Sequence, residues 1–216
     1  NLIYADTTLL LYEKGDYVST ISQPSFVLLM LELLDLKPGM KVFELGAGSG
    51  WNAALMGHMV GKSGHVISYE IIPEMTKEAQ RNIAQFDLPQ VEVVLGDALQ
   101  EIWELEEYDR GVFTAGARDI PGILFDVIKP GGKLLFVLNT SQGDLLLVLQ
   151  KMHDHFKVIQ TIHCKFVNVT GPSFETYYNN FSQLFSVRTP ITIWPQGTLD
   201  LGDNILVGKD MIFRWE

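Results

Sequence analysis

The chain has 216 residues, of which 47% are hydrophobic and 19% are charged, and its formal net charge is -10. This length fits one α/β domain with an added segment, and the apolar fraction excludes a disordered chain. No apolar run reaches the roughly 18 residues that a membrane helix needs. No basic segment followed by an apolar stretch opens the chain, so we expect no secretory signal and a cytoplasmic setting. The 16 Lys and Arg residues form no run, so we expect neither a nucleic-acid partner nor a membrane partner.

The Cys and His residues give little support for metal chemistry. Cys164 is the single cysteine, which excludes an intrachain disulfide and a Cys-rich metal site. It lies in an apolar, strand-like stretch, where a small buried hydrophobic side chain is the expected role. His153 and His155 lie at an expected turn without further ligand candidates, so we predict no metal site.

The central part of the chain alternates between two kinds of pattern. First comes a helix predicted over Gln23–Leu34 and opened by Pro24. Strands are then predicted at Lys41–Leu45, His65–Glu70, Val91–Leu95, Asp109–Thr114 and Lys133–Leu138. Helices are predicted between them at Ser49–Val60, Pro73–Phe86 and Asp119–Ile128. This alternation predicts an α/β fold with a doubly wound, mostly parallel sheet.

The C-terminal part has a different pattern. Residues Asp144–Met152 fit a helix or a strand, whereas Phe156–Val169 alternates and favours a strand. The short connection across Met152–His155 would make the two an antiparallel hairpin at a sheet edge. Beyond Gly171 the short apolar runs are Ile191–Trp194, Asn204–Val207 and Met211–Trp215. We therefore predict a domain over residues 1–170, with a small β-rich extension over residues 171–216 packed on it.

The most informative segment runs from Val42 to Gly50, where a predicted strand enters a G-x-G-x-G turn. Glycine is needed where the backbone bends tightly and a ligand must approach closely. In open α/β sheets, ligands bind at the carboxyl ends of the strands. A dinucleotide fingerprint, G-x-G-x-x-G, would need glycine at position 51, where Trp51 stands. An NAD-dependent oxidoreductase is therefore disfavoured.

Acidic residues occur in order at the ends of successive predicted strands. Glu44 precedes the glycine turn, Glu70 ends the second strand, and Gly96-Asp97-Ala98 follows the third. Each alone would suit a solvated cap or a simple turn. Together they resemble the motifs of class I methyltransferases, which have a Rossmann-like sheet and use S-adenosylmethionine, releasing S-adenosylhomocysteine. The resemblance implies these cofactor-binding residues: Glu44, Gly46, Ala47, Gly48, Ser49, Gly50, Asn52, Glu70, Ile71, Gly96, Asp97, Ala98 and Thr114.

A second motif narrows the resemblance. The segment Thr20-Ile21-Ser22-Gln23-Pro24-Ser25 is similar to the T-I-S-x-P signature of the protein-L-isoaspartate O-methyltransferases. The further matches are Tyr4-x-Asp6, Gly50-Trp51-Asn52-Ala53-Ala54, Tyr108-Asp109, Thr114-Ala115-Gly116-Ala117, Ile120-Pro121 and Lys129-Pro130-Gly131-Gly132-Lys133. The resemblance covers about Tyr4 to Val169.

This resemblance implies methyl transfer from S-adenosylmethionine to the α-carboxylate of L-isoaspartyl residues in damaged proteins or peptides. Spacing alone favours Ser22 as a helix N-cap. The family places the matching serine beside the transferring methyl group, so Ser22 is the predicted catalytic residue. The predicted substrate-binding residues are Thr20, Ile21, Ser22, Ala115 and Gly116. A carboxylate with a pKa of about 4 is already ionised at neutral pH, so no general base is required.

Departures from the family pattern leave the acceptor open. Only residues 1–19 precede the motif, where the family has a longer helical segment, and N-terminal truncation would explain this. Phe166-Val167-Asn168-Val169 stands in place of a Phe-Val-Pro-Leu-like ending, and the chain continues beyond it. The alternatives are a methyltransferase with another acceptor and a non-catalytic module that binds the cofactor or a partner. The oligomeric state does not follow from the sequence.

Overall fold

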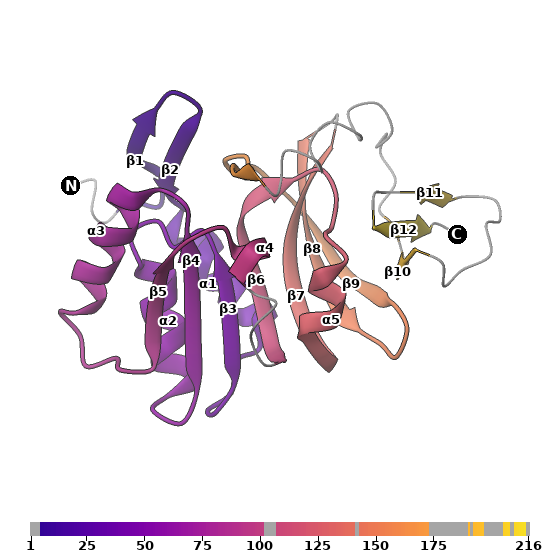
Figure 1. Cartoon of the computed structure of the whole chain (residues 1–216), viewed down its shortest axis with the longest axis horizontal. Helices are drawn as coiled ribbons and strands as arrows, with labels where there is room; N and C mark the ends of the chain where they lie inside the picture. The colour runs from indigo at the N-terminus through magenta and orange to yellow at the C-terminus, as the bar shows by residue number, and fades with distance from the viewer. Residues whose placement is uncertain are drawn as a thin grey trace. The chain divides into compact units, whose positions relative to one another are not determined.

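The computed structural model describes residues 5–101, 107–140, 143–172, 190, 192–196, 205–207 and 210–214. The backbone divides into two compact units, residues 1–96 and residues 97–216, which we call the N-terminal unit and the C-terminal unit. Figure 1 labels the helices and strands of both. The predicted division at residue 170 stays a prediction.

The N-terminal unit contains a parallel sheet in the order β3–β4–β5. These strands span Lys41–Leu45, His65–Glu70 and Val91–Leu95. Their bounds are those predicted from the sequence. The side chains of β3 and β4 are buried along almost the whole of both strands, which is the pattern expected of parallel strands inside an α/β protein.

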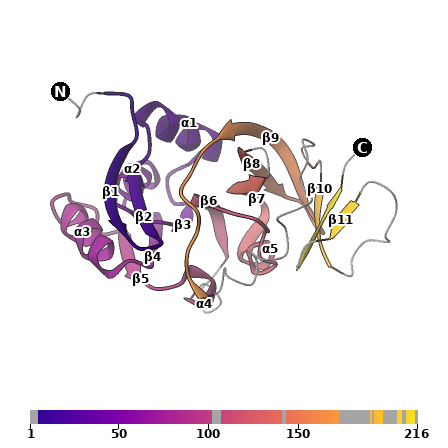
Figure 2. The same cartoon turned by 90° about the horizontal axis from the view of Figure 1, so that it is seen from above.

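The helices of this unit are α1, α2 and α3, and they span Pro24–Leu34, Trp51–Val60 and Pro73–Ile83. Figure 2 shows them together on one side of β3, β4 and β5. The predicted helices are present, but α2 begins two residues late because Ser49 and Gly50 belong to the glycine turn, and α3 ends at Ile83 instead of Phe86. Gly57 allows α2 to approach β5 closely, since a Cβ there would lie 2.3 Å from Cγ2 of Val91.

A hairpin that the sequence did not predict precedes α1. Its strands are β1, Leu9–Lys14, and β2, Tyr17–Ile21, and they pair antiparallel from Leu9 beside Ile21 to Lys14 beside Tyr17. Gly15 has a φ of 60°, the left-handed conformation that a tight turn between two strands requires. Because β2 ends at Ile21, the hairpin leads directly into Ser22 (Figure 1).

The C-terminal unit is built on long strands. Its elements before the extension are α4 at Ala98–Glu101, β6 at Tyr108–Ala117, α5 at Ile123–Val127, β7 at Ile128–Thr140, β8 at Gly143–Lys151 and β9 at Phe156–Cys164. β6 pairs parallel with β7, while β7, β8 and β9 pair antiparallel in turn. The ambiguous segment after residue 143 is therefore a strand. The predicted hairpin is confirmed, and its turn is closed by a Met152 N–H bond to His155 O of 2.8 Å.

The predicted helix over Asp119–Ile128 is shorter in the structure, beginning only at Ile123. The Asp119 side chain accepts a 2.8 Å bond from the Ile120 backbone N–H, which holds an irregular turn there. The backbone N–H of Gly122, the N-cap residue of α5, donates to Oδ2 of Asp210 at 3.1 Å. The start of this helix thus depends on a residue far along the chain.

The extension continues the sheet of the C-terminal unit. β10, Thr192–Pro195, pairs antiparallel with β9; β12, Met211–Arg214, pairs with β10; and β11, Ile205–Val207, pairs with β12. β9 is therefore not an edge strand at Phe156 and Lys157. The predicted apolar runs that include Ile191, Asn204 and Trp215 extend beyond the described residues.

No helix among the described residues is both long enough and apolar enough to cross a membrane. Within the same ranges, no three His, Cys, Asp or Glu side chains gather in a group that could hold a metal ion.

Candidate active site

The glycine turn is held by backbone bonds at the end of β4. Gly46, Gly48 and Gly50 have φ values of 96°, 53° and 81°, a left-handed region that side-chain-bearing residues rarely adopt. The N–H groups of Gly46 and Ala47 both donate to the Tyr69 carbonyl oxygen, at 2.9 and 3.1 Å. The turn therefore folds over the strand beside it.

The far side of the turn packs against α3. A Cβ on Gly50 would lie 3.1 Å from the carbonyl oxygen of Ala79, so this glycine is needed for helix packing as well as for its φ. The Asn82 side-chain amide donates to the Ser49 carbonyl oxygen at 2.9 Å. Asn82 is a site residue that sequence reasoning missed, because an Asn on a helix carries no sign of its distant partner.

Glu44 lies inside the sheet and not at its surface. Its side chain is fully buried, and it accepts hydrogen bonds from Nδ2 of Asn52 at 2.6 Å and from Oγ of Ser68 at 2.5 Å. Ser68 stands directly beside it in the register of β3 with β4. Burial raises the pKa of Glu44 to about 7, with a smaller rise from the charge of Glu70. These contacts tie the start of α2 to the sheet beneath the glycine turn.

Glu70 closes the turn from the end of β4. Its carboxylate accepts the backbone N–H of Gly48 at 2.9 Å and that of Ile72 at 3.1 Å, and the N–H of Ile71 also bonds to it. Burial raises the pKa of Glu70, while these backbone bonds oppose the rise. Its backbone carbonyl accepts from Gly96 at 3.0 Å. The predicted residues Gly48, Glu70, Ile71 and Gly96 are thus in contact.

The Ser22 segment lies against the glycine turn. A Cβ on Gly48 would stand 3.5 Å from Oγ of Ser19 and 3.8 Å from the carbonyl oxygen of Thr20. Ser19 is buried and was not predicted from the sequence. Ser22 and its neighbour Ile21 are half-buried.

Ser22 is not the cap of α1. The N-cap residue is Gln23, and it forms no side-chain cap hydrogen bond. Within the part of the chain that the structure describes, the Ser22 hydroxyl has no hydrogen-bond partner. The N-cap alternative for Ser22 is therefore wrong.

The remaining predicted residues belong to the C-terminal unit. Asp97 directly precedes α4, where its Oδ1 accepts from the Leu99 N–H at 3.1 Å, and Ala98 is buried. Thr114 and Ala115 lie in an irregular stretch of β6, where the pairing with β7 shifts between Val112 and Gly116. Such irregularities often re-aim side chains beside functional sites.

Gly116 is enclosed on both sides. Its N–H donates to Val167 O and its carbonyl accepts from Val169 N–H, each at 2.8 Å. A Cβ on Gly116 would lie 2.3 Å from Nδ2 of Asn139, so a larger residue here would require the Asn139 side chain to move. The segment that departs from the family ending therefore lies beside a predicted substrate-binding residue.

Comparison with known proteins identifies the family of this chain. A family model described as Protein-L-isoaspartate(D-aspartate) O-methyltransferase matches residues 2–173. The chain belongs to this family. A protein-L-isoaspartate O-methyltransferase of Methanothrix thermoacetophila is 41% identical over 152 residues, 70% of this chain and 71% of the relative. That of Pyrococcus horikoshii is 41% identical over 154 residues, 70% of this chain and 69% of the relative.

Solved structures of similar proteins agree with this family assignment. A protein-L-isoaspartate O-methyltransferase structure matches with a TM-score of 0.73 and 30% identity, covering 79% of this chain and 54% of that chain, so this chain spans about half of it. A Plasmodium falciparum protein in complex with S-adenosyl-L-homocysteine matches with a TM-score of 0.68 at 22% identity, covering 77% of this chain and 81% of that one. They confirm the predicted Rossmann-like class I methyltransferase fold.

Proposed function

We propose that this chain transfers a methyl group from S-adenosylmethionine to the α-carboxylate of L-isoaspartyl residues in damaged proteins or peptides. Membership of the family confirms the predicted enzyme class, an S-adenosylmethionine-dependent O-methyltransferase, and its cofactor. One observation carries the proposal for this chain. The strand that leads into Ser22 contacts the glycine turn at Gly48, so predicted acceptor-binding and cofactor-binding residues lie together in the N-terminal unit.

The glycine turn and Glu70 suit an adenosyl cofactor. The left-handed glycines leave the backbone of the turn open to close approach. A carboxylate has about four acceptor positions, and the Gly48, Ile71 and Ile72 N–H groups use three at Glu70, leaving one for a ribose hydroxyl. Glu44 and Asn52, both buried, would support the turn from beneath.

The reaction needs alignment and no proton transfer. Bound S-adenosylmethionine would supply a methyl carbon made electrophilic by its positively charged sulfur. A carboxylate oxygen of the acceptor would form the new O–C bond as the C–S bond broke, and the electron pair of that bond would stay on sulfur. The products would be a methyl ester and a neutral thioether. Positioning of reacting groups can lower such a barrier by several kcal/mol.

We assign to Ser22 the role of binding the acceptor carboxylate. Its hydroxyl can donate a hydrogen bond to one carboxylate oxygen and so direct the other toward the methyl carbon. Ser22 is half-buried, and its hydroxyl bonds to no residue within the described ranges, so binding an acceptor would break no existing hydrogen bond. In the C-terminal unit, the backbone near Ala115 and Gly116 is proposed to contact the acceptor peptide.

The test is transfer of labelled methyl from S-adenosylmethionine to a short isoaspartyl peptide, with the matching aspartyl peptide as control. Selective, base-labile labelling of the isoaspartyl peptide is expected. Ser22→Ala should lower kcat by on the order of a hundredfold, with the Kd for S-adenosylhomocysteine nearly unchanged. Ser63→Ala, in an exposed turn before β4, should change neither. Equal labelling of both peptides, or of neither with cofactor still bound, would reject this acceptor in favour of another.

The partner named by this proposal is an isoaspartyl-containing protein or peptide. The cytoplasmic setting expected from the sequence remains a prediction, as does the lack of a nucleic-acid partner. A direct measurement of mass in solution would give the oligomeric state.

A further inference from the structure

The first turn of α1 needs a hydrogen-bond acceptor that its own sequence does not supply. Pro24 opens the helix and has no N–H group, while the N–H groups of Phe26 and Val27 both donate to the Gln23 carbonyl oxygen. The remaining donor of this turn is the Ser25 N–H, which needs an acceptor from outside the helix. Gln23, the N-cap residue, forms no side-chain cap bond to it.

Asp6 supplies that acceptor from outside the helix. Its Oδ1 accepts the Ser25 N–H at 2.9 Å, and its Oδ2 accepts Nε2 of Gln23 at 2.8 Å. The Gln23 amide also reaches Oγ of Ser25 at 3.0 Å. The bond from the Ser25 backbone is the main cause that lowers the pKa of Asp6, followed by the Gln23 bond, so Asp6 is ionised at neutral pH. A negative charge here also suits the positive end of the helix.

These bonds surround Ser22 in the chain. On its N-terminal side, Ile21 is paired with Leu9 at the open end of the hairpin. On its C-terminal side, Gln23 and Ser25 are held by Asp6, itself three residues before Leu9. The hairpin base and the helix start are therefore fastened to each other, with Ser22 between them. The backbone direction at Ser22 is set from both sides, although its hydroxyl bonds to nothing among the described residues.

We propose that Asp6 is a positioning residue for catalysis, which holds the Ser22–Ser25 turn so that the Ser22 hydroxyl meets the acceptor carboxylate. This inference rests on the proposed function of Ser22. Asp6 acts through Ser22, because its hydrogen bonds go to Gln23 and Ser25 on the turn that follows Ser22. Misplacement of a reacting group by about 1 Å can cost on the order of a hundredfold in rate, so loss of Asp6 lowers kcat more than it changes cofactor binding.

The experiment compares Asp6→Ala, Asp6→Asn, Ser22→Ala and the Asp6→Ala/Ser22→Ala pair with the parent chain. For Asp6→Ala we expect kcat on the isoaspartyl peptide to fall by on the order of ten- to a hundredfold, with the Kd for S-adenosylhomocysteine nearly unchanged. Asp6→Asn should recover most of the loss, because its amide oxygen can still accept from Ser25 while Gln23 turns its own amide round. The kcat of the double variant should be no lower than that of Ser22→Ala alone.

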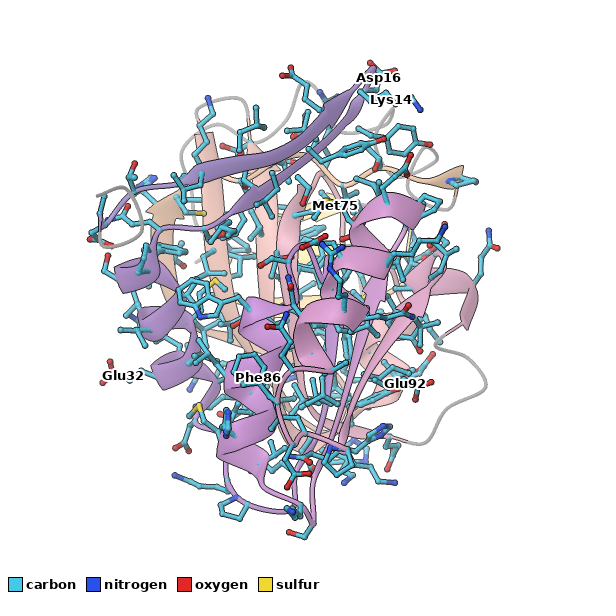
Figure 3. All side chains as sticks on the ribbon, turned by 90° about the vertical axis from the view of Figure 1, so that its left-hand side faces the viewer. Lys14, Asp16, Glu32, Met75, Phe86 and Glu92 are labelled. Atoms are coloured by element: carbon cyan, nitrogen blue, oxygen red, sulfur yellow. The ribbon has the colours of Figure 1, made fainter. Side chains whose placement is uncertain are left out.

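The matched control is Asp16→Ala. Asp6 and Asp16 are both exposed, but Asp16 lies at the tip of the hairpin between β1 and β2 (Figure 3), whereas Asp6 precedes β1. The control should leave kcat unchanged. If Asp6→Ala matches this control, or if its effect multiplies with that of Ser22→Ala, Asp6 does not act through Ser22 and the inference is overturned.

A second measurement is independent of turnover. Hydrogen exchange of the Ser25 amide should be faster in Asp6→Ala than in the parent chain and unchanged in Asp16→Ala. Faster exchange together with no turnover by the parent on an isoaspartyl peptide would reject the proposed function while supporting the structural role of Asp6. Unchanged exchange would overturn the inference whatever the activity.

Discussion

Replacing Glu44 by Gln tests whether a titrating carboxyl group is buried in the sheet beneath the glycine turn. Gln has nearly the same shape, and its amide oxygen can accept from Asn52 while its NH2 group donates to Oγ of Ser68. The substitution thus keeps both hydrogen bonds and removes a carboxyl group that must lose a proton in the core. It should change how stability depends on pH more than it changes the fold.

The magnitude follows from the pKa. Burial raises the pKa of Glu44 from 4.5 to about 7, so the native state holds the proton more tightly than the unfolded chain does. The free energy of unfolding therefore falls as the pH rises through this window, by roughly 1.4 kcal/mol for each pKa unit. The whole rise corresponds to a loss of about 3 kcal/mol between pH 4.5 and pH 8. Glu44→Gln should not suffer this loss.

The assay is urea unfolding of the parent chain and Glu44→Gln at intervals from pH 5 to pH 8. The variant should be similar to the parent near pH 5 and should exceed it by about 3 kcal/mol at pH 8. Glu70 contributes to both curves, so only their difference reports on Glu44. Glu32→Gln, on the outer face of α1 (Figure 3), is the control and should follow the parent. A difference that stays flat with pH would refute the burial of a titrating carboxyl at this position.

Three other substitutions or reactions test separate parts of the structure. Gly50→Ala should lower the free energy of unfolding by about 1–3 kcal/mol more than Gly131→Ala does. The two glycines have similar φ values, 81° and 79°, but only Gly50 faces a close neighbour, Ala79. Equal losses in urea unfolding would exclude this crowding. Phe213→Ala should cost about 3–5 kcal/mol, since Phe213 is fully buried in β12, and a cost below about 1 kcal/mol would mean that the extension adds nothing to the core. Burial, followed by the charge of Asp144, raises the pKa of Cys164 from 9.0 to about 12. At pH 8 the folded chain should therefore react with a thiol reagent on the order of a thousandfold more slowly than the chain unfolded in urea. Similar rates in the two states would contradict this.

Local patterns were sufficient for the parallel strands. β3, β4 and β5 begin and end where they were predicted, and β3 and β4 are buried along almost their whole length, as is typical of parallel strands. The Gly-rich turn was equally visible, since its left-handed conformations admit few residues other than glycine. The β1–β2 hairpin was missed although Gly15-Asp16 between two β-forming runs is a turn signal.

Side-chain partners far apart in the chain were beyond prediction. Nothing in the sequence pairs Asp6 with Ser25, Asn82 with Ser49, or Asp210 with Gly122, because each pair meets only after the elements between them have folded. The start of α5 illustrates the consequence. Local spacing predicted a helix from Asp119, whereas the bonds at Asp119 and Asp210 delay it to Ile123.

The sequence by itself determined the fold class and the family, and it predicted the residues around the cofactor, because backbone periodicity, glycine geometry and the Thr20–Ser25 motif are all local properties. Only the tertiary structure showed what the side chains of several of these residues contact. Glu44 was predicted as a cofactor-binding residue, and the structure buries its side chain and bonds it to Asn52 and Ser68. The direction in which a carboxylate points, and whether water reaches it, depends on packing between distant segments, and spacing along a chain carries no record of that.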